Sequence, residues 1–157
     1  MQSYAIIFDL QGVLCIDPDV ILRAPMHTEP ERHPYWLIAG LAIARQCVDA
    51  RTPNGSARHR VFLMSNCRFT AQQIKSAHPE LFDHFQAIIT CATYPYYKPD
   101  PAAFRYVISK YELEPANCIF IDDSQLNCAI AHSLGMHAIV YDDPEKVRAQ
   151  LKALNVF

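Results

Sequence analysis

The sequence has 157 residues, the length of one ordinary domain. Hydrophobic residues make up 51% of it and charged residues 19%, which allows a buried core and excludes a disordered chain. The formal net charge is −2 with Lys and Arg spread along the chain, so nothing indicates binding to nucleic acid or to an anionic membrane.

Signals for targeting and for cross-linking are also missing. No apolar run reaches the roughly 18–20 residues of a transmembrane helix, and the N-terminus lacks the basic start of a signal peptide. We therefore expect a cytoplasmic protein with no membrane partner. The six cysteines form no C-x-x-C pair and mostly lie in or beside apolar runs, which favours reduced thiols over disulfides or structural zinc.

Short apolar runs alternate with segments of helical periodicity along the chain. In chain order we expect a strand at 4–8, a helix at 34–50, a strand at 61–64, a helix at 70–77, a strand at 87–91, a helix at 101–111, a strand at 118–121, a helix at 124–134, a strand at 137–141 and a helix at 144–154. Thr70 is a plausible N-cap, Pro101 suits a helix start, and Gly135 suits a helix end. The stretches 17–34 and 51–59 are interpreted as loops.

This alternation predicts a doubly wound α/β fold, with three layers and a mainly parallel five-stranded sheet. Ligands of such sheets bind at the carboxyl ends of the strands, near the topological switch point. The residues that follow each strand are therefore the candidates for function.

Polar and charged residues do follow four of the expected strands. They are Asp9, Gln11 and Gly12 after the first, Ser65 and Asn66 after the second, Lys98 after the third, and Asp122 and Asp123 after the fourth. Carboxylates and a backbone carbonyl near Gln11 are the hard oxygen ligands that Mg²⁺ prefers. Ser65, Asn66, Gly12 and nearby backbone N–H groups could hold phosphate oxygens, and Lys98 could offset phosphoryl charge.

These four motifs, in this order, resemble those of the haloacid dehalogenase (HAD) superfamily, in its phosphatase-like branch. The resemblance runs from about Tyr4 to Tyr141. It implies that Asp9 is the nucleophile, that Ser65 binds phosphate and that Lys98 stabilises the transferring group. It also implies an Mg²⁺ site made by Asp9, the carbonyl of Gln11, Asp123 as a direct ligand and Asp122 acting through water. The remaining matches are Pro99-Asp100-Pro101 with Phe104, and Asn127 followed by Leu134-Gly135-Met136.

The first departure from the family pattern is Gln11. Phosphatases of this family usually have Asp two residues after the nucleophile, where it protonates the leaving oxygen and then activates water. Glutamine cannot ionise, so we expect slower turnover while metal and phosphate binding persist. Proton transfer of this kind contributes roughly 10²–10⁴ in rate.

The second departure is the short stretch between the first two motifs. It leaves only residues 15–34 for a cap remnant, so residues 1–157 are interpreted as one HAD-like core domain. An open site could accept a small phosphoester or a phosphorylated macromolecule. It is also compatible with self-association.

Three functions remain open at this point. The first is Mg²⁺-dependent hydrolysis of a phosphomonoester through an aspartyl-phosphate on Asp9. The second is a catalytically impaired module that keeps Mg²⁺ and phosphate binding and acts as a sensor or interaction partner. The third, carbon–halogen cleavage, needs an apolar pocket under a cap that this chain is too short to build.

Overall fold

The protein contains one five-stranded, all-parallel sheet. The computed structural model describes residues 2–18 and 36–157. The strands are β1 (Ala5–Phe8), β2 (Arg60–Ser65), β3 (Ala87–Thr90), β4 (Cys118–Asp122) and β5 (His137–Val140). Their order in the sheet is β3-β2-β1-β4-β5, and each neighbouring pair is parallel. The expected doubly wound α/β sheet is confirmed.

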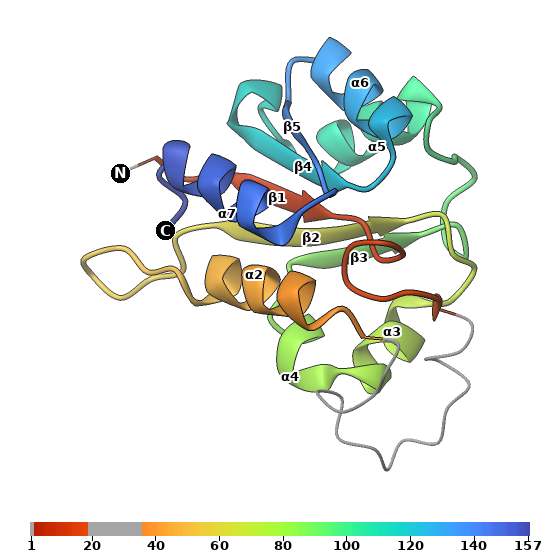
Figure 1. Ribbon diagram of the computed structural model, residues 1–157. Helices are drawn as coiled ribbons and strands as arrows, with labels where there is room; N and C mark the ends of the chain where they lie inside the picture. Colours follow the sequence, from red (N-terminus) through yellow and green to blue (C-terminus); the bar gives the residue numbers. More distant parts are fainter. Residues whose placement is uncertain (1, 19–35) are drawn as a thin grey trace.

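Helices cover both faces of this sheet (Figure 1). The described α-helices are α2 (Ile38–Asp49), α3 (Ala71–Ala77), α4 (Pro79–Phe82), α5 (Pro101–Lys110), α6 (Gln125–Ser133) and α7 (Pro144–Ala153). Helices α5 and α6 lie on one face, and α2, α3, α4 and α7 lie on the other. No helix in the described ranges is long and apolar enough to cross a membrane.

Each face of the sheet has its own hydrophobic core. Successive strand side chains point to opposite faces, so Ile6 and Phe8 pack with α2, α4 and α7, while Ile7 packs with α5 and α6. Because both faces are covered, every residue of β1 is buried. This explains why the strands read as continuous apolar runs rather than as alternating ones.

Most expected element boundaries lie within a residue or two of the observed ones. Thr70 accepts a hydrogen bond from the Gln73 backbone N–H in a capping box, and Gly135 has a φ of +90° after α6. Helix α4 was missed because it is a single turn that follows α3 directly. The expected helix at 34–50 is observed from Ile38 onward.

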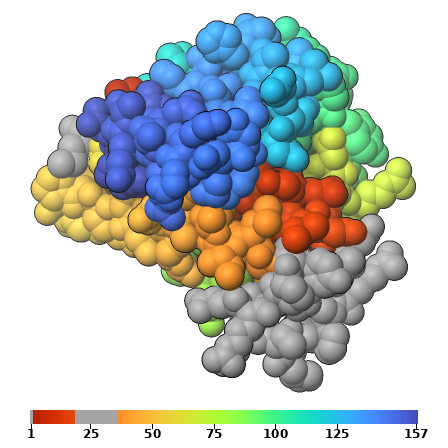
Figure 2. Space-filling model, viewed as in Figure 1, coloured from red at the N-terminus to blue at the C-terminus, as the bar shows by residue number. Residues whose placement is uncertain are grey.

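The cap remnant expected at 15–34 lies mostly outside the described residues. The chain that flanks it is anchored beside the first strand, because Leu37 N–H donates to Leu14 O at 2.9 Å and Cys15 pairs with Trp36. Helix α2 approaches this segment closely: a Cβ on Gly40 would lie 1.9 Å from Val13 O. Figure 2 shows that part of the segment after β1, in red, reaches the surface, and Gln11 and Ile16 are its exposed residues.

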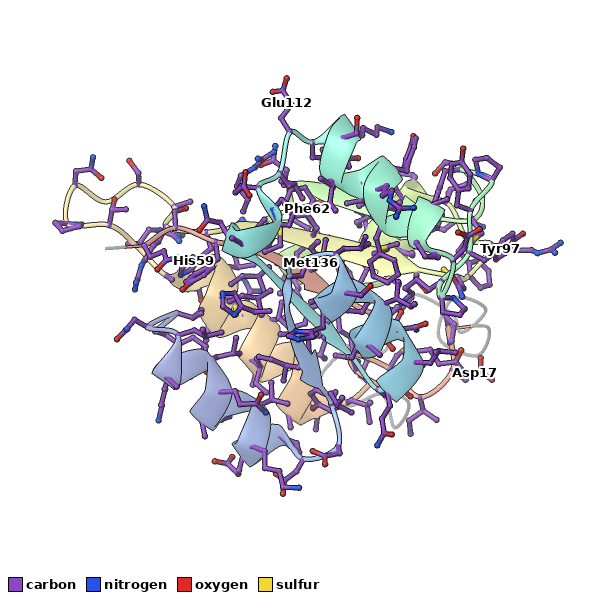
Figure 3. The ribbon with its side chains drawn as sticks, turned by 90° about the horizontal axis from the view of Figure 1, so that it is seen from above. Asp17, His59, Phe62, Tyr97, Glu112 and Met136 are labelled. Atoms are coloured by element: carbon purple, nitrogen blue, oxygen red, sulfur yellow. The ribbon has the colours of Figure 1, made fainter. Side chains whose placement is uncertain are left out.

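Hydrogen bonds connect the amino and carboxyl ends of the described chain on the side of the sheet opposite the carboxyl ends of the strands (Figures 1 and 3). The buried His59 ring accepts from Tyr4 N–H at Nδ1 (3.2 Å), and its Nε2 lies 2.9 Å from Val156 O. The neighbouring Arg58 guanidinium donates to carbonyls of Gln2, Asn155 and Val156.

Candidate active site

The topological switch point of the sheet lies at β1. From β1 the chain proceeds outward to β2 and β3, and then returns to the other side of β1 to form β4 and β5. Asp9 follows β1 directly, and its backbone N–H donates to Ile121 O of β4 at 2.9 Å. The carboxyl ends of β1 and β4 are therefore held together, which is where ligands of doubly wound sheets bind.

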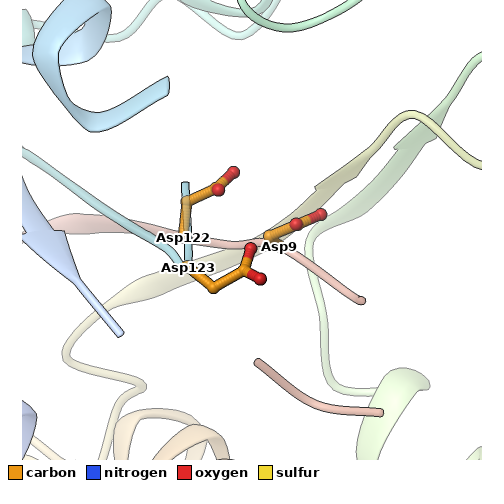
Figure 4. A group of neighbouring side chains, drawn as sticks. All are labelled: Asp9, Asp122 and Asp123. Carbon is orange, nitrogen blue, oxygen red and sulfur yellow. The ribbon is translucent and has the colours of Figure 1, made fainter. Parts of the chain in front are cut away.

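Three aspartates meet at this point (Figure 4). Asp9, Asp122 and Asp123 each place one carboxylate oxygen within 4.8 Å of the others. Asp9 and Asp122 are buried, whereas Asp123 is exposed. From the sequence, we expect Asp9 and Asp123 to lie close enough to share a cation, and in the structure a carboxylate oxygen of each lies within 4.8 Å of the other.

Lys98 lies between the two buried carboxylates. Its Nζ is 2.9 Å from Asp9 Oδ1 and 2.6 Å from Asp122 Oδ2. Burial acts to lower the pKa of Lys98, but the two carboxylates raise it above its ordinary value. The ammonium is therefore charged and bound to both partners.

The negative charge of the site is only partly compensated. Burial raises the pKa of Asp9 from 3.8 to about 6; Lys98 acts against this rise and Asp122 adds to it. Burial, followed by the charge of Asp122, also raises the pKa of Asp123. Three carboxylates facing one ammonium leave the centre negative, which is the environment that a divalent cation would stabilise.

Gly12 provides the space that Asp123 occupies. Its φ is +77°, and a Cβ there would lie 2.2 Å from Asp123 Oδ2. A larger residue at position 12 would therefore both strain the backbone and displace the carboxylate. Gly12 N–H donates to Cys15 O at 2.7 Å, so this loop is also held by its own backbone.

The residues of the second motif lie beside Lys98. Asn66 brackets the lysine backbone: its Nδ2 donates to Lys98 O at 2.8 Å and its Oδ1 accepts from Lys98 N–H at 2.9 Å. The buried Ser65 hydroxyl accepts from Cys67 N–H at 3.2 Å, which leaves its own proton available to a ligand. Asn66, which follows β2, thus positions Lys98, which follows the neighbouring strand β3.

Asn127 holds the buried carboxylate of Asp122. Its Nδ2 lies 3.1 Å from Oδ1 and 3.0 Å from Oδ2, and Ser124 N–H adds a bond to Oδ1 at 2.8 Å. Asn127 matches the family motif, but the sequence does not predict which residue it contacts. In the structure, Asp122 is oriented by hydrogen bonds and Lys98, while Asp123 is left open.

A hollow of about 580 Å³ opens above this cluster. Its lining joins all four motifs through Asp9, Gln11, Ser65, Asn66, Lys98, Asp123 and Asn127, and it also includes Asp17, Pro18, Cys67, Arg68 and Phe69. Arg68 and Phe69 were not among the predicted site residues, although both directly follow the second motif. Their position after the carboxyl end of a strand could have indicated that they line the site.

Comparison with known proteins identifies the family. Residues 54–135 match the family model described as haloacid dehalogenase-like hydrolase, more than half of the chain. The chain belongs to the haloacid dehalogenase-like hydrolases.

Among curated relatives, the chain is similar to acyl-CoA dehydrogenase family member 10 of Mus musculus, at 42% identity over 57 residues. The match covers 36% of this chain and 5% of the mouse protein. This chain thus spans only a small part of the length of the curated relatives it matches, 24% at most among the first three.

Solved HAD structures share the fold. A hydrolase from Streptococcus pneumoniae has a TM-score of 0.67 at 16% identity, covering 97% of this chain and all of that one. A HAD family enzyme from Bacteroides thetaiotaomicron, solved with magnesium and inorganic phosphate, has a TM-score of 0.56 at 16% identity, covering 92% of this chain and 98% of the other. At these identities the likeness establishes the HAD fold alone.

Proposed function

We propose that this chain is a Mg²⁺-dependent phosphomonoester hydrolase that works through an aspartyl-phosphate on Asp9. The observation that supports this most strongly is the placement of Asp9, which lines the hollow, touches Lys98 at 2.9 Å and shares one centre with Asp122 and Asp123. The HAD fold and the phosphate-bound relative agree with this reading.

The residues fit a bound Mg²⁺. Asp9 and the exposed Asp123 offer hard oxygen ligands, and Gly12 leaves room for the Asp123 carboxylate. Burial raises the pKa of both aspartates and the charge of Asp122 adds to the rise, so a bound cation would stabilise their ionised forms. The carbonyl of Gln11 is the proposed main-chain ligand, and Asp122 is assigned an outer role through water. Bound Mg²⁺ would offset the negative charge of the phosphoryl group.

The first step is attack of the Asp9 carboxylate on phosphorus, which forms an Asp9 O–P bond as the bond to the leaving oxygen breaks. Lys98 stabilises the charge on the phosphoryl oxygens, and Ser65 and the backbone N–H groups near Asn66 and Gly12 are proposed to bind them. In the second step water attacks phosphorus, and the Asp9 carboxylate is released.

Gln11 makes both steps slow in this proposal. It lines the hollow at the family position for the acid–base aspartate, but its amide can neither protonate the leaving oxygen nor take a proton from water. We therefore expect faster turnover of aryl and acyl phosphates, whose leaving groups need little protonation, than of alkyl phosphates.

The second candidate function is a phosphate- and Mg²⁺-binding module without useful turnover. The presence of Gln11 favours this candidate, because glutamine cannot transfer a proton while the cluster of Asp9, Asp122 and Lys98 stays intact. Its partners would be phosphorylated molecules, recognised by binding alone.

A phosphatase assay distinguishes the two candidates. With Mg²⁺ and p-nitrophenyl phosphate, the wild-type chain should release phosphate, and Asp9→Asn should abolish release. Asp49→Asn, an equal change at an exposed position of α2, should leave the rate unchanged. Phosphate release that survives in Asp9→Asn, or no release by the wild type while phosphate still binds, would contradict the hydrolase proposal.

A further inference from the structure

We propose that Arg68 binds a second anionic group on the substrate. The site would then select small phosphomonoesters whose alcohol part carries a carboxylate or another phosphate. This inference rests on the proposed function above and adds its substrate class.

Arg68 extends from a fixed backbone into the wall of the hollow. It lies between β2 and α3, next to the phosphate-binding motif, and its side chain is exposed. Its two neighbours are bonded to the β3 end: Cys67 O accepts from Cys91 N–H at 3.0 Å, and Phe69 O accepts from Thr90 Oγ1 at 2.6 Å. The backbone that carries Arg68 is therefore held in place, so ligand binding would have to order only the arginine side chain.

The charges in the hollow leave Arg68 available. Among the described residues of its lining, Lys98 and Arg68 are the cations, and Asp9, Asp17 and Asp123 are the acidic side chains. The Lys98 ammonium is bound to Asp9 and Asp122, whereas within the described part of the chain no carboxylate forms an ion pair with Arg68. Its planar fork of donors matches a carboxylate or a phosphate in two parallel hydrogen bonds.

The dimensions of the hollow indicate a small substrate. Its volume of about 580 Å³ lies within the ~300–1,000 Å³ common for small-molecule sites. The transferring phosphoryl group would occupy the end near Asp9 and Lys98, so the rest is open to the alcohol part. Gln11, Asn66 and Asn127 offer that part polar contacts, and Arg68 offers it a charge.

Three alkyl phosphates test this subsite: glycerol 3-phosphate with an uncharged alcohol part, 3-phosphoglycerate with a carboxylate, and propane-1,3-diol bisphosphate with a second phosphate. The kcat/KM of the wild type should be higher for the two anionic compounds, and their ratio shows which anion is preferred. Arg68→Gln should lower kcat/KM for the favoured anionic compound by about 10- to 100-fold, the effect of losing a charge-assisted hydrogen bond. For that compound, the kcat/KM of Arg68→Lys should lie between those of the wild type and Arg68→Gln.

The neutral compound and a matched variant provide the controls. Turnover of glycerol 3-phosphate should change by less than ~3-fold in Arg68→Gln, within the spread of surface substitutions. Arg105→Gln removes an exposed charge on α5, outside this hollow, and should change none of the three. Equal losses on all three compounds in Arg68→Gln, or no loss on any, would overturn the subsite.

Failure of the hydrolase proposal would be recognised separately. If the wild type turns over none of the three compounds, calorimetric titration of each into wild-type and Arg68→Gln protein with Mg²⁺ decides the question. Tighter binding of an anionic compound that is lost in Arg68→Gln would support the subsite even without catalysis. Equal affinity of the wild type for all three compounds would reject it.

Discussion

At the scale of single residues, the protonation of Asp9 is set by burial and by one ammonium group. Burial raises its pKa to about 6, while Lys98, 2.9 Å away, opposes that rise. Lys98 divides its charge between Asp9 and Asp122, so neither carboxylate is fully neutralised. The ionised form of Asp9, which the proposed mechanism requires, would be stabilised by any further positive charge bound at the site.

Gln11→Asp should restore proton transfer at the leaving oxygen. We expect turnover of alkyl phosphates to rise at least ~10-fold, the lower part of the range for general acid–base catalysis after allowing for imperfect geometry. Turnover of p-nitrophenyl phosphate should rise less, because that leaving group departs without a proton. Steady-state rates on both substrates provide the measurement, with Gln11→Asn as the control. A Gln11→Asp variant no faster than the wild type would disprove the role assigned to position 11.

Gly12→Ala should weaken Mg²⁺ binding. The added Cβ would lie 2.2 Å from Asp123 Oδ2, so the carboxylate must leave its position in the cluster. Gly55→Ala is the matched control, since Gly55 also has a positive φ, +85°, but has no atom within 4 Å of an added Cβ. Both variants should lose some stability through backbone strain, roughly 1 kcal/mol or more. Only Gly12→Ala should raise the Kd for Mg²⁺ in calorimetry; equal Kd values in the two variants would refute this role of Gly12.

At the scale of elements, the segment between β2 and α3 connects the core to the site. It begins after Ser65, the last residue of β2, carries Asn66 and Arg68, and ends at the capping box of Thr70 and Gln73. The box satisfies backbone donors at the start of a helix of only 7 residues, which is too short to be stable alone. The helix therefore depends on its cap and on Ile74, which packs in the core.

Thr70→Ala should lower the free energy of unfolding by roughly 0.5–2 kcal/mol, because the Thr70 hydroxyl that accepts from Gln73 N–H is lost. Urea denaturation measures this difference. Ser109→Ala, an exposed change within α5, should leave stability unchanged or raise it slightly. If Thr70→Ala unfolds at the wild-type midpoint, the cap does not stabilise the native state.

At the scale of the whole molecule, His59 connects the two ends of the described chain. Tyr4 N–H can only donate and Val156 O can only accept, so the ring is neutral, with its proton on Nε2. Burial lowers the pKa of His59 below its ordinary value of 6.5, and the bond to Val156 only partly opposes this. Protonation at Nδ1 would cost the bond from Tyr4.

The contribution of His59 to stability should therefore fall as the pH falls. The folded state binds the His59 proton less tightly than the unfolded state, so the contribution of His59 is fully present above pH 6.5 and is lost as the pH falls toward the lower folded pKa. Asp9 acts in the opposite sense, because its folded pKa is raised to about 6. Comparison with a non-titrating variant separates the two residues.

The measurement is the urea unfolding free energy at pH 7.5 and pH 5.5 for the wild type and His59→Gln. The variant should be less stable at pH 7.5, and the wild type should lose more stability between the two values than the variant does. Parallel pH dependence of the two proteins would show that His59 is not the titrating group.

Much of the fold followed from local patterns. The five apolar runs became the five strands because a strand buried on both faces has no polar positions to interrupt it. The caps at Thr70 and Gly135 were readable because each depends on a single residue type. Helix α4 was not readable, since four residues cannot show a helical period.

Apolar periodicity and motif spacing are local properties, so they were sufficient to predict the five strands, most of the helices and the chemical groups that follow the strands. The folded arrangement was needed to show that Lys98 joins Asp9 to Asp122, that Gly12 makes room for Asp123 and that Asn66 holds Lys98. Within the described residues, the folded chain also places Arg68 in the same hollow without an ion pair to a carboxylate. The reason is physical: these contacts join segments far apart in the chain, and strand order and side-chain direction set their distances.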